Sequence, residues 1–186
     1  MKYEEIKQAF RDCDSDIKNK FFFVVRDTEK GIWGPSSLDI VFELFTKINL
    51  KKYQRFLDIG AGDGRVVAIA SLFTNAAGIE SDKKLVESGN KIMGKLKLKA
   101  QLICDDFFNH DFSKYDVLFI NPDKGFHHGL EDKLLRDMDK EAVLLVYNNI
   151  FMPRFLKRGT THWIEQVPIT EFRNSELRNS TNGREL

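Results

Sequence analysis

The chain has 186 residues, of which 29 are Lys or Arg and 28 are Asp or Glu, so its formal net charge is +1 with histidine neutral. This balance excludes a nucleic-acid binder that works by bulk positive charge, and it excludes an acidic tail protein. Hydrophobic residues make up 42% of the sequence, which predicts one sizeable buried core. Cys13 and Cys104 have no zinc-ligand spacing, and we find no signal peptide or membrane segment, so a cytoplasmic protein is expected.

The first 50 residues are predicted to be an N-terminal extension that packs on the rest of the domain or over its ligand-binding end. Ser36 or Ser37 is a suitable N-cap for the helix that follows, because a serine hydroxyl accepts a hydrogen bond from a free backbone N–H of the first turn. In chain order, the predicted elements are a helix over 3–12, a buried strand or packing plug over 21–25, a turn-rich segment over 31–37 and a helix over 38–48.

From Arg55 the pattern changes to short apolar segments that alternate with amphipathic ones. The segments 115–120 and 142–147 are apolar almost throughout, which is typical of parallel strands covered on both faces. Repeated strand–helix alternation predicts an α/β fold with an open, doubly wound, mostly parallel sheet. We expect one domain over 1–186, with its core at 51–172 and a polar tail at 173–186. The predicted strands are 56–59, 75–80, 101–104, 115–120, 142–147 and 162–167, and the helices are 65–73, 82–96 and 130–138.

A glycine-rich turn follows the first core strand. Gly60, Gly62 and Gly64 form a G-x-G-x-G pattern, whereas a dinucleotide fingerprint has the spacing G-x-G-x-x-G. Asp58 and Asp63 bracket this turn, and two carboxylates would repel a pyrophosphate. The turn therefore favours a cationic or zwitterionic ligand. The alternative is a turn that only packs the strand on the helix.

Further carboxylates stand at the ends of the next two predicted strands. Glu80 ends the second strand, where an acidic side chain can accept hydrogen bonds from ribose hydroxyls. Asp105 and Asp106 end the third, where a carboxylate or a backbone group can meet the amino group of adenine. This order of acids argues against a turn with a packing role only.

The segment Asp58–Arg65, with the sequence DIGAGDGR, resembles the cofactor loop of class I S-adenosylmethionine-dependent methyltransferases. The resemblance covers roughly residues 36–150 by motif order, and it implies a Rossmann-like fold, methyltransferase activity and S-adenosyl-L-methionine as cofactor. It implies that the glycines line the methionine end of the cofactor, that Asp58 and Asp63 face its cationic groups, that Glu80 holds the ribose and that Asp105 reads the adenine. The cofactor-binding residues expected on this basis are Asp58, Gly60, Ala61, Gly62, Asp63, Gly64, Glu80, Ser81, Asp105, Asp106 and Asn121.

The segment after the fourth predicted strand begins Asn121-Pro122-Asp123-Lys124. Methyltransferases that act on nucleic-acid bases or on protein glutamine carry Asn/Asp-Pro-Pro-Tyr/Phe at this place, and only the first two residues match. Asn121 is expected to orient an attacking amine beside the transferred methyl group. The alternative for Asn121-Pro122 is a turn that only ends the strand. Asp123 and His127 are the other catalytic candidates, His127 as a general base. The alternative for His127 and His128 is a surface or helix-capping pair. No metal site is expected.

The identity of the methyl acceptor rests on the segment Trp33-Gly34-Pro35-Ser36-Ser37. It is similar to an aromatic–Pro–Ser segment of small protein-lysine methyltransferases of the ATP-synthase c-subunit type, which implies a protein lysine as acceptor. Six lysines within residues 82–99 keep an RNA acceptor open, although a solvated helix face is the simpler interpretation. A small-molecule acceptor and a non-catalytic S-adenosylmethionine-binding protein are further alternatives. The sequence does not indicate an oligomeric state.

Overall fold

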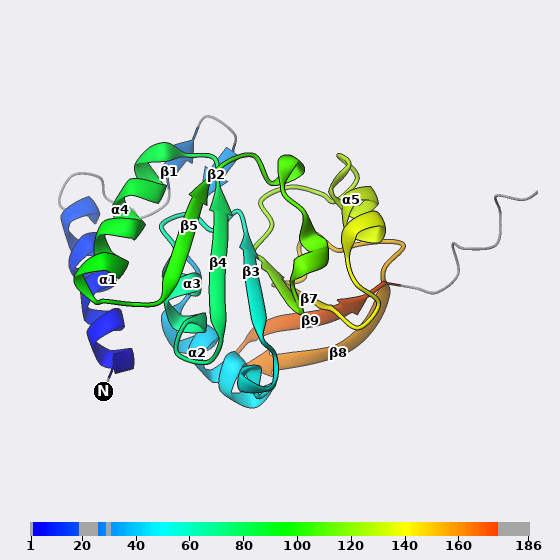
Figure 1. Ribbon diagram of the computed structural model, residues 1–186, viewed down its shortest axis with the longest axis horizontal. Helices are drawn as coiled ribbons and strands as arrows, with labels where there is room; N and C mark the ends of the chain where they lie inside the picture. The colour runs from blue at the N-terminus through cyan, green and yellow to red at the C-terminus, as the bar shows by residue number, and fades with distance from the viewer. Residues whose placement is uncertain (1, 19–25, 29–30, 175–186) are drawn as a thin grey trace, which may run out of the picture.

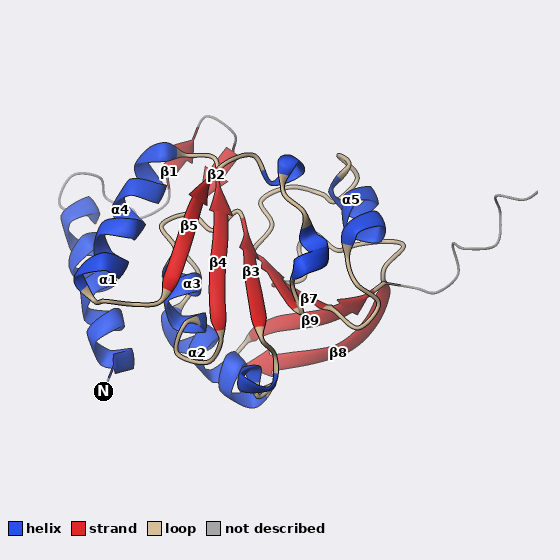
Figure 2. Ribbon diagram, viewed as in Figure 1, coloured by secondary structure: helices blue, strands red, loops and turns tan. Residues whose placement is uncertain are grey.

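The computed structural model describes residues 2–18, 26–28 and 31–174, and in this part of the chain helices flank a central sheet on both faces (Figure 1, Figure 2). The helices are α1 (Lys2–Lys18), α2 (Leu38–Lys47), α3 (Arg65–Ala70), α4 (Lys83–Lys95) and α5 (Leu130–Asp137), with 3-10 turns η1 (Leu50–Lys52), η2 (Phe107–Asn109) and η3 (Phe112–Lys114). The strands are β1 (Arg26–Thr28), β2 (Gly31–Trp33), β3 (Arg55–Ile59), β4 (Asn75–Glu80), β5 (Ala100–Cys104), β6 (Val117–Ile120), β7 (Val143–Tyr147), β8 (Lys157–Ile164) and β9 (Val167–Arg173).

The main sheet has the strand order β5-β4-β3-β6-β7-β9-β8. Strands β3 to β7 pair in parallel, whereas β9 is antiparallel to both of its neighbours. Strands β1 and β2 form a separate antiparallel pair. The predicted α/β class with a doubly wound, mostly parallel sheet is therefore confirmed.

Two hydrophobic cores lie on the two faces of the sheet. Side chains of successive strand residues point to opposite faces, so Phe56 joins the core under α1, α2, α3 and α4, while Leu57 joins the core under α5 and η3. Both side chains have 0% exposure. Burial on both faces explains why the central strands are apolar throughout.

The helix starts follow from side-chain capping. The hydroxyl of Ser37 accepts a hydrogen bond from the backbone N–H of Ile40 at the start of α2. The carboxylate of Asp82 accepts hydrogen bonds from the backbone N–H groups of Lys84 and Leu85 at the start of α4. Such caps satisfy donors that have no partner within the helix, and they define where the chain leaves the sheet edge.

The C-terminal part of the sheet differs from the prediction. The single strand expected over 162–167 is wrong, because Glu165 and Gln166 form the turn of a hairpin between β8 and β9. Glu165 has a φ of 52°, a conformation that glycine or asparagine usually marks in hairpin turns. Without that signal, the alternating pattern of this segment predicts one continuous strand.

Other element boundaries also shift. The helix expected over 3–12 continues to Lys18, and the helix expected over 65–73 ends at Ala70. No α-helix follows β5 within the described residues, since η2 and η3 make the connection to β6. The expected turn at 31–37 contains β2, and the segment 21–25 lies outside the described residues.

In the described ranges, no helix is both long enough and apolar enough to cross a membrane.

The topology has one point where the chain changes direction across the sheet. From β3 the chain moves outward to β4 and β5, and it then returns to the other side of β3 as β6. The loops that follow β3 and β6 therefore run in opposite directions from the sheet, and a crevice forms between them. Ligands of open α/β sheets bind at this switch point.

Candidate active site

A cavity of about 550 Å³ lies at the carboxyl ends of β3, β4, β5 and β6. Its size is within the range of small-molecule sites, about 300–1,000 Å³. Most of the predicted site residues come together here, although they are far apart in the sequence. Those that line the cavity are Asp58, Gly60, Ala61, Asp63, Glu80, Ser81, Asp105, Asp106, Asn121 and Asp123, whereas Gly62, Gly64 and His127 do not.

The three glycines of the loop after β3 all have positive φ angles, which are 72° at Gly60, 56° at Gly62 and 78° at Gly64. A side chain at any of them would be strained in this conformation. A Cβ atom at Gly60 would meet nothing within 4 Å, so the space beside it is open at the cavity wall. A Cβ atom at Gly64 would lie 2.6 Å from Leu102 Cδ1. Gly60 thus leaves room for a ligand, whereas Gly64 lets the loop pack on β5.

Glu80 ends β4 and links the glycine loop to the start of α4. Its Oε2 atom accepts a hydrogen bond of 3.0 Å from the backbone N–H of Gly62, and its Oε1 atom accepts one of 2.8 Å from the backbone N–H of Asp82. These bonds hold the carboxylate at the cavity wall. Oε1 also accepts a hydrogen bond of 3.3 Å from Ser81 Oγ, whereas Oε2 has a further lone pair that can accept from a hydroxyl of a ligand.

Asp58 is the last but one residue of β3, and its side chain is only 3% exposed. Burial raises the pKa of this carboxyl group well above its usual range, and the nearby carboxylates of Glu80 and Asp63 raise it further. A cationic group in the cavity would offset both effects, because an opposite charge favours the ionised carboxylate. A cationic ligand in the cavity would therefore favour the ionised form of Asp58.

Asp63 lines the cavity, but Arg65 already holds its carboxylate. Arg65 Nη2 lies 2.7 Å from Asp63 Oδ2 and 2.7 Å from Asp14 Oδ1 of α1. Burial by itself would lower the pKa of Arg65, but the two carboxylates raise it above its usual range. The sequence did not indicate Arg65 or Asp14, since no local pattern relates residues 51 positions apart.

The segment after β5 combines acidic and aromatic side chains. Asp105 Oδ1 accepts hydrogen bonds from the Asp106 backbone N–H and from Asn109 Nδ2, and Asp106 Oδ1 accepts one from the Phe108 backbone N–H. Phe107 and Phe108 also line the cavity, with their ring centroids 4.6 Å apart. Flat apolar rings suit a nucleobase. Sequence reasoning missed these rings, and two consecutive phenylalanines directly after the acidic pair were the available signal.

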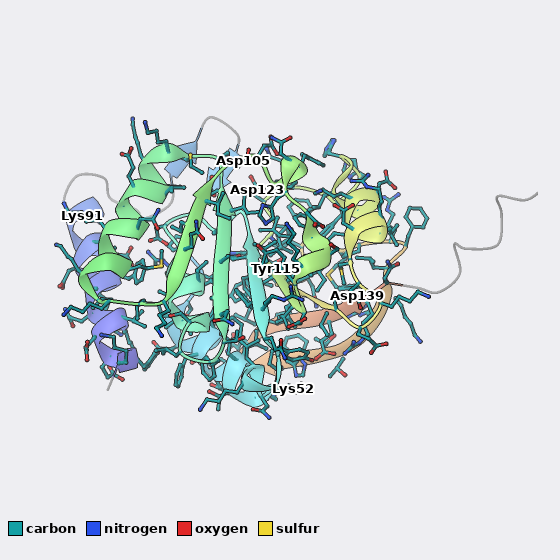
Figure 3. All side chains as sticks on the ribbon, in the orientation of Figure 1. Lys52, Lys91, Asp105, Tyr115, Asp123 and Asp139 are labelled. Atoms are coloured by element: carbon teal, nitrogen blue, oxygen red, sulfur yellow. The ribbon has the colours of Figure 1, made fainter. Side chains whose placement is uncertain are left out.

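Two of the three predicted catalytic residues, Asn121 and Asp123, line the cavity. Asn121 Nδ2 donates a 3.2 Å hydrogen bond to Ser36 Oγ, and Ser36 lines the cavity together with Gly34 and Pro35. Asp123 is exposed at the cavity wall, and Figure 3 shows it at the same edge of the sheet as Asp105.

The two histidines differ from the prediction in their placement. His128 lines the cavity, whereas His127, the candidate general base, does not. Both are exposed, and their rings are tilted by 43° with centroids 4.0 Å apart. The geometry thus places His128 rather than His127 beside the cavity. The role of His127 as a base stays a prediction.

The charge of the cavity wall is negative. Six carboxylates line it. Arg65 also lines the cavity, and its positive charge is paired with Asp63 and Asp14. Lys124 adds one exposed cation at the edge. Within the described residues, no group of three or more His, Cys, Asp or Glu side chains is arranged to hold a metal ion.

The fold is similar to that of several solved structures, two of which are described as methyltransferases. An RNA methyltransferase from Salinibacter ruber, in complex with S-adenosyl-L-homocysteine, has a TM-score of 0.68 at 18% identity over 81% of this chain and 100% of that chain. The putative methyltransferase yhhF from Escherichia coli has a TM-score of 0.58 at 18% identity over 76% and 88% of the two chains. A mutant of MtNAS in complex with S-adenosylmethionine has a TM-score of 0.62 at 11% identity over 93% and 71%. No curated protein matches the chain significantly.

This fold, with an acidic cavity beside a G-x-G-x-G loop at the switch point, defines a class I S-adenosylmethionine-dependent methyltransferase. The family model described as "Histone methylation protein DOT1" matches residues 26–164, well over half of the chain. The chain belongs to this family. The predicted enzyme class and cofactor are thereby confirmed, while the role of each site residue remains a prediction.

Proposed function

We propose that this protein transfers the methyl group of S-adenosylmethionine to the side-chain amine of a protein lysine. The observation that carries the proposal is the exposed carboxylate of Asp123 at the cavity wall, because a carboxylate there favours a cationic acceptor over a phosphate-rich one. The family description, histone methylation, supports a protein acceptor, and the aromatic–Pro–Ser segment supports the lysine type.

The cavity residues fit the cofactor as follows. Asp58 and the open space at Gly60 would face its cationic methionine end, Glu80 would accept from its ribose hydroxyls, and Phe107 and Phe108 would receive its adenine ring. When bound, S-adenosylmethionine supplies an electrophilic methyl group. A cofactor bound in the cavity would displace water from it, which would strengthen the interactions of the charged groups there.

The chain's own residues act on the acceptor by attraction and orientation. Asp123, exposed at the cavity wall, attracts the lysine ammonium. The ammonium must lose a proton to solvent before its lone pair can attack, so the rate is expected to rise with pH. Asn121 then receives one N–H of the neutral amine on its amide oxygen, which directs the lone pair toward the methyl group.

The proposal is tested with S-adenosylmethionine labelled in its methyl group and a fractionated cell extract. We expect label in protein that survives ribonuclease and that is recovered as methyl-lysine after acid hydrolysis. Label in RNA or in small molecules would contradict the lysine acceptor and identify RNA or a small molecule as the acceptor instead. Cofactor binding without any transfer would instead show a binding protein.

The charge argument is tested with Asp123→Asn against Asp139→Asn. Both variants remove one exposed carboxylate, but Asp139 lies at the opposite end of the sheet from Asp123 (Figure 3). We expect Asp123→Asn to lower kcat/KM for the lysine acceptor by about fivefold, on the order of 1 kcal/mol, with unchanged cofactor affinity. Equal effects of the two variants would contradict a local role of Asp123.

A further inference from the structure

A relay of hydrogen bonds joins three separate segments at the acceptor end of the cavity. Ser36 precedes α2, Asn121 follows β6 and Asn148 follows β7. Asn148 Nδ2 donates to Asn121 Oδ1 at 3.0 Å, and Asn121 Nδ2 donates to Ser36 Oγ at 3.2 Å. Ser36 is 8% exposed, so the far end of the relay is buried.

The direction of the relay is set at Asn148. The backbone N–H of Ile150 donates to the Asn148 side-chain oxygen at 2.8 Å, and a backbone N–H can only donate. This bond identifies the oxygen of the Asn148 amide, so its NH₂ group must face Asn121. The atom of Asn121 that accepts is then its oxygen, and its NH₂ group must face Ser36. Oxygen and nitrogen of an amide have nearly the same shape, so only such bonds decide the orientation.

The backbone of Asn148 supports this arrangement. Its φ of 63° is left-handed, a conformation that asparagine tolerates better than most residues. Its backbone N–H donates to the carbonyl of Pro168 at 2.9 Å, which anchors the residue to β9. The backbone of Asn148 is therefore anchored to Pro168, and its side-chain oxygen is bonded to the Ile150 N–H. Both bonds fix the position from which Asn148 donates to Asn121.

We propose that Asn148 and Ser36 are positioning residues that hold the Asn121 amide with its oxygen ready for a substrate N–H. The inference rests on the proposed function, in which Asn121 orients the acceptor amine. One lone pair of Asn121 Oδ1 is used by Asn148, and the second is left for the substrate. An amide turned by 180° would offer an N–H there instead, and an N–H repels the N–H of an incoming amine.

The test compares two replacements of Asn148 with a control one residue away. Asn148→Asp keeps the acceptor for the Ile150 N–H but has no N–H for Asn121, whereas Asn148→Gly removes both and suits the left-handed backbone. Asn149→Asp adds the same charge beside the relay, and its oxygen still accepts from Thr170 Oγ1. A merely structural role of Asn148 in the loop predicts a normal Asn148→Asp variant.

The first readout is the side-chain amide signal of Asn121 in ¹H–¹⁵N spectra of the cofactor-free protein, which needs no acceptor. We expect this signal to shift in both Asn148 variants and in Ser36→Ala, and to stay unchanged in Asn149→Asp. An unchanged Asn121 signal in Asn148→Asp overturns the relay, whichever acceptor the enzyme uses.

The second readout is methyl transfer to the lysine acceptor. We expect kcat to fall about tenfold in Asn148→Asp, Asn148→Gly and Ser36→Ala, with the Kd for S-adenosylmethionine within about twofold of the wild type. Wild-type kcat in Asn148→Asp would overturn the positioning role. If the Asn121 signal shifts but the wild-type enzyme methylates no lysine, the proposed function fails while the relay stands.

Discussion

At the scale of single residues, the ionised Asp58 lowers the stability of the fold, although the same charge favours binding of a cationic ligand. Its pKa is higher in the folded protein than in the unfolded chain, because burial and the neighbouring Glu80 and Asp63 disfavour the charged form. The ionised group therefore destabilises the fold: stability falls as pH rises through the unfolded pKa, about 3.9, toward the folded one. Above the folded pKa the loss is complete and constant.

The variant Asp58→Asn tests this interpretation. Since asparagine carries no charge, we expect a higher Tm at neutral pH, by about 2–4 °C for each kcal/mol gained, and a smaller dependence of Tm on pH in the acidic range. We also expect weaker S-adenosylmethionine binding, by about tenfold, because the cation loses its partner. Calorimetric scans across pH and titration with the cofactor measure both; a lower Tm with intact affinity would contradict the argument.

At the scale of elements, α1 is coupled to the cofactor loop although it belongs to the N-terminal extension. Ile6 and Phe10 of α1 are fully buried, and the Arg65 guanidinium lies 5.4 Å from the Phe10 ring centre. Asp14 then holds the same guanidinium that holds Asp63 of the glycine loop. The helix is therefore a support of the cofactor loop, and its packing depends on a buried charge network.

We expect Asp14→Asn to weaken this support. Loss of one charged partner of Arg65 should reduce the free energy of unfolding by about 1–2 kcal/mol and weaken cofactor binding severalfold. Asp12→Asn is the matched control, since Asp12 lies on the same helix, is exposed and accepts from Gln8. Urea unfolding and cofactor titration provide the measurements, and identical behaviour of the two variants would argue against the coupling.

At the scale of the whole molecule, the site is assembled from four strand ends and from the segment before α2. A ligand that contacts the residues at the ends of β3, β4, β5 and β6 would link the two halves of the sheet on either side of the switch point. Any ligand that binds only the folded protein stabilises it by mass action. The cofactor should therefore stabilise the molecule globally.

S-adenosylmethionine at about 100 times its Kd should raise the free energy of unfolding by about 2.7 kcal/mol. For a chain of this size, this corresponds to an increase in Tm of roughly 5–10 °C. NAD is the matched comparison, because the G-x-G-x-G loop lacks the dinucleotide spacing and carries carboxylates that repel a pyrophosphate. Stabilisation by NAD and not by S-adenosylmethionine in a thermal-shift series would contradict the cofactor assignment.

Local sequence signals determined much of this protein. The apolar central strands, the capping residues and the loop Asp58–Arg65 predicted the sheet, its ligand end and the cofactor, because each depends on residues close together in the chain. The acids at 80, 105 and 106 were found the same way, since parallel strands bring their carboxyl ends to one edge.

Tertiary structure alone decided the contacts between distant segments. The pairing of Asp14 with Arg65, the relay from Asn148 to Ser36 and the placement of His128 rather than His127 at the cavity depend on how helices and loops dock. The β8–β9 hairpin was missed because its turn lacks glycine and asparagine. Sequence periodicity reports the face that an element buries, but packing of the two hydrophobic cores decides which polar side chains meet across the site.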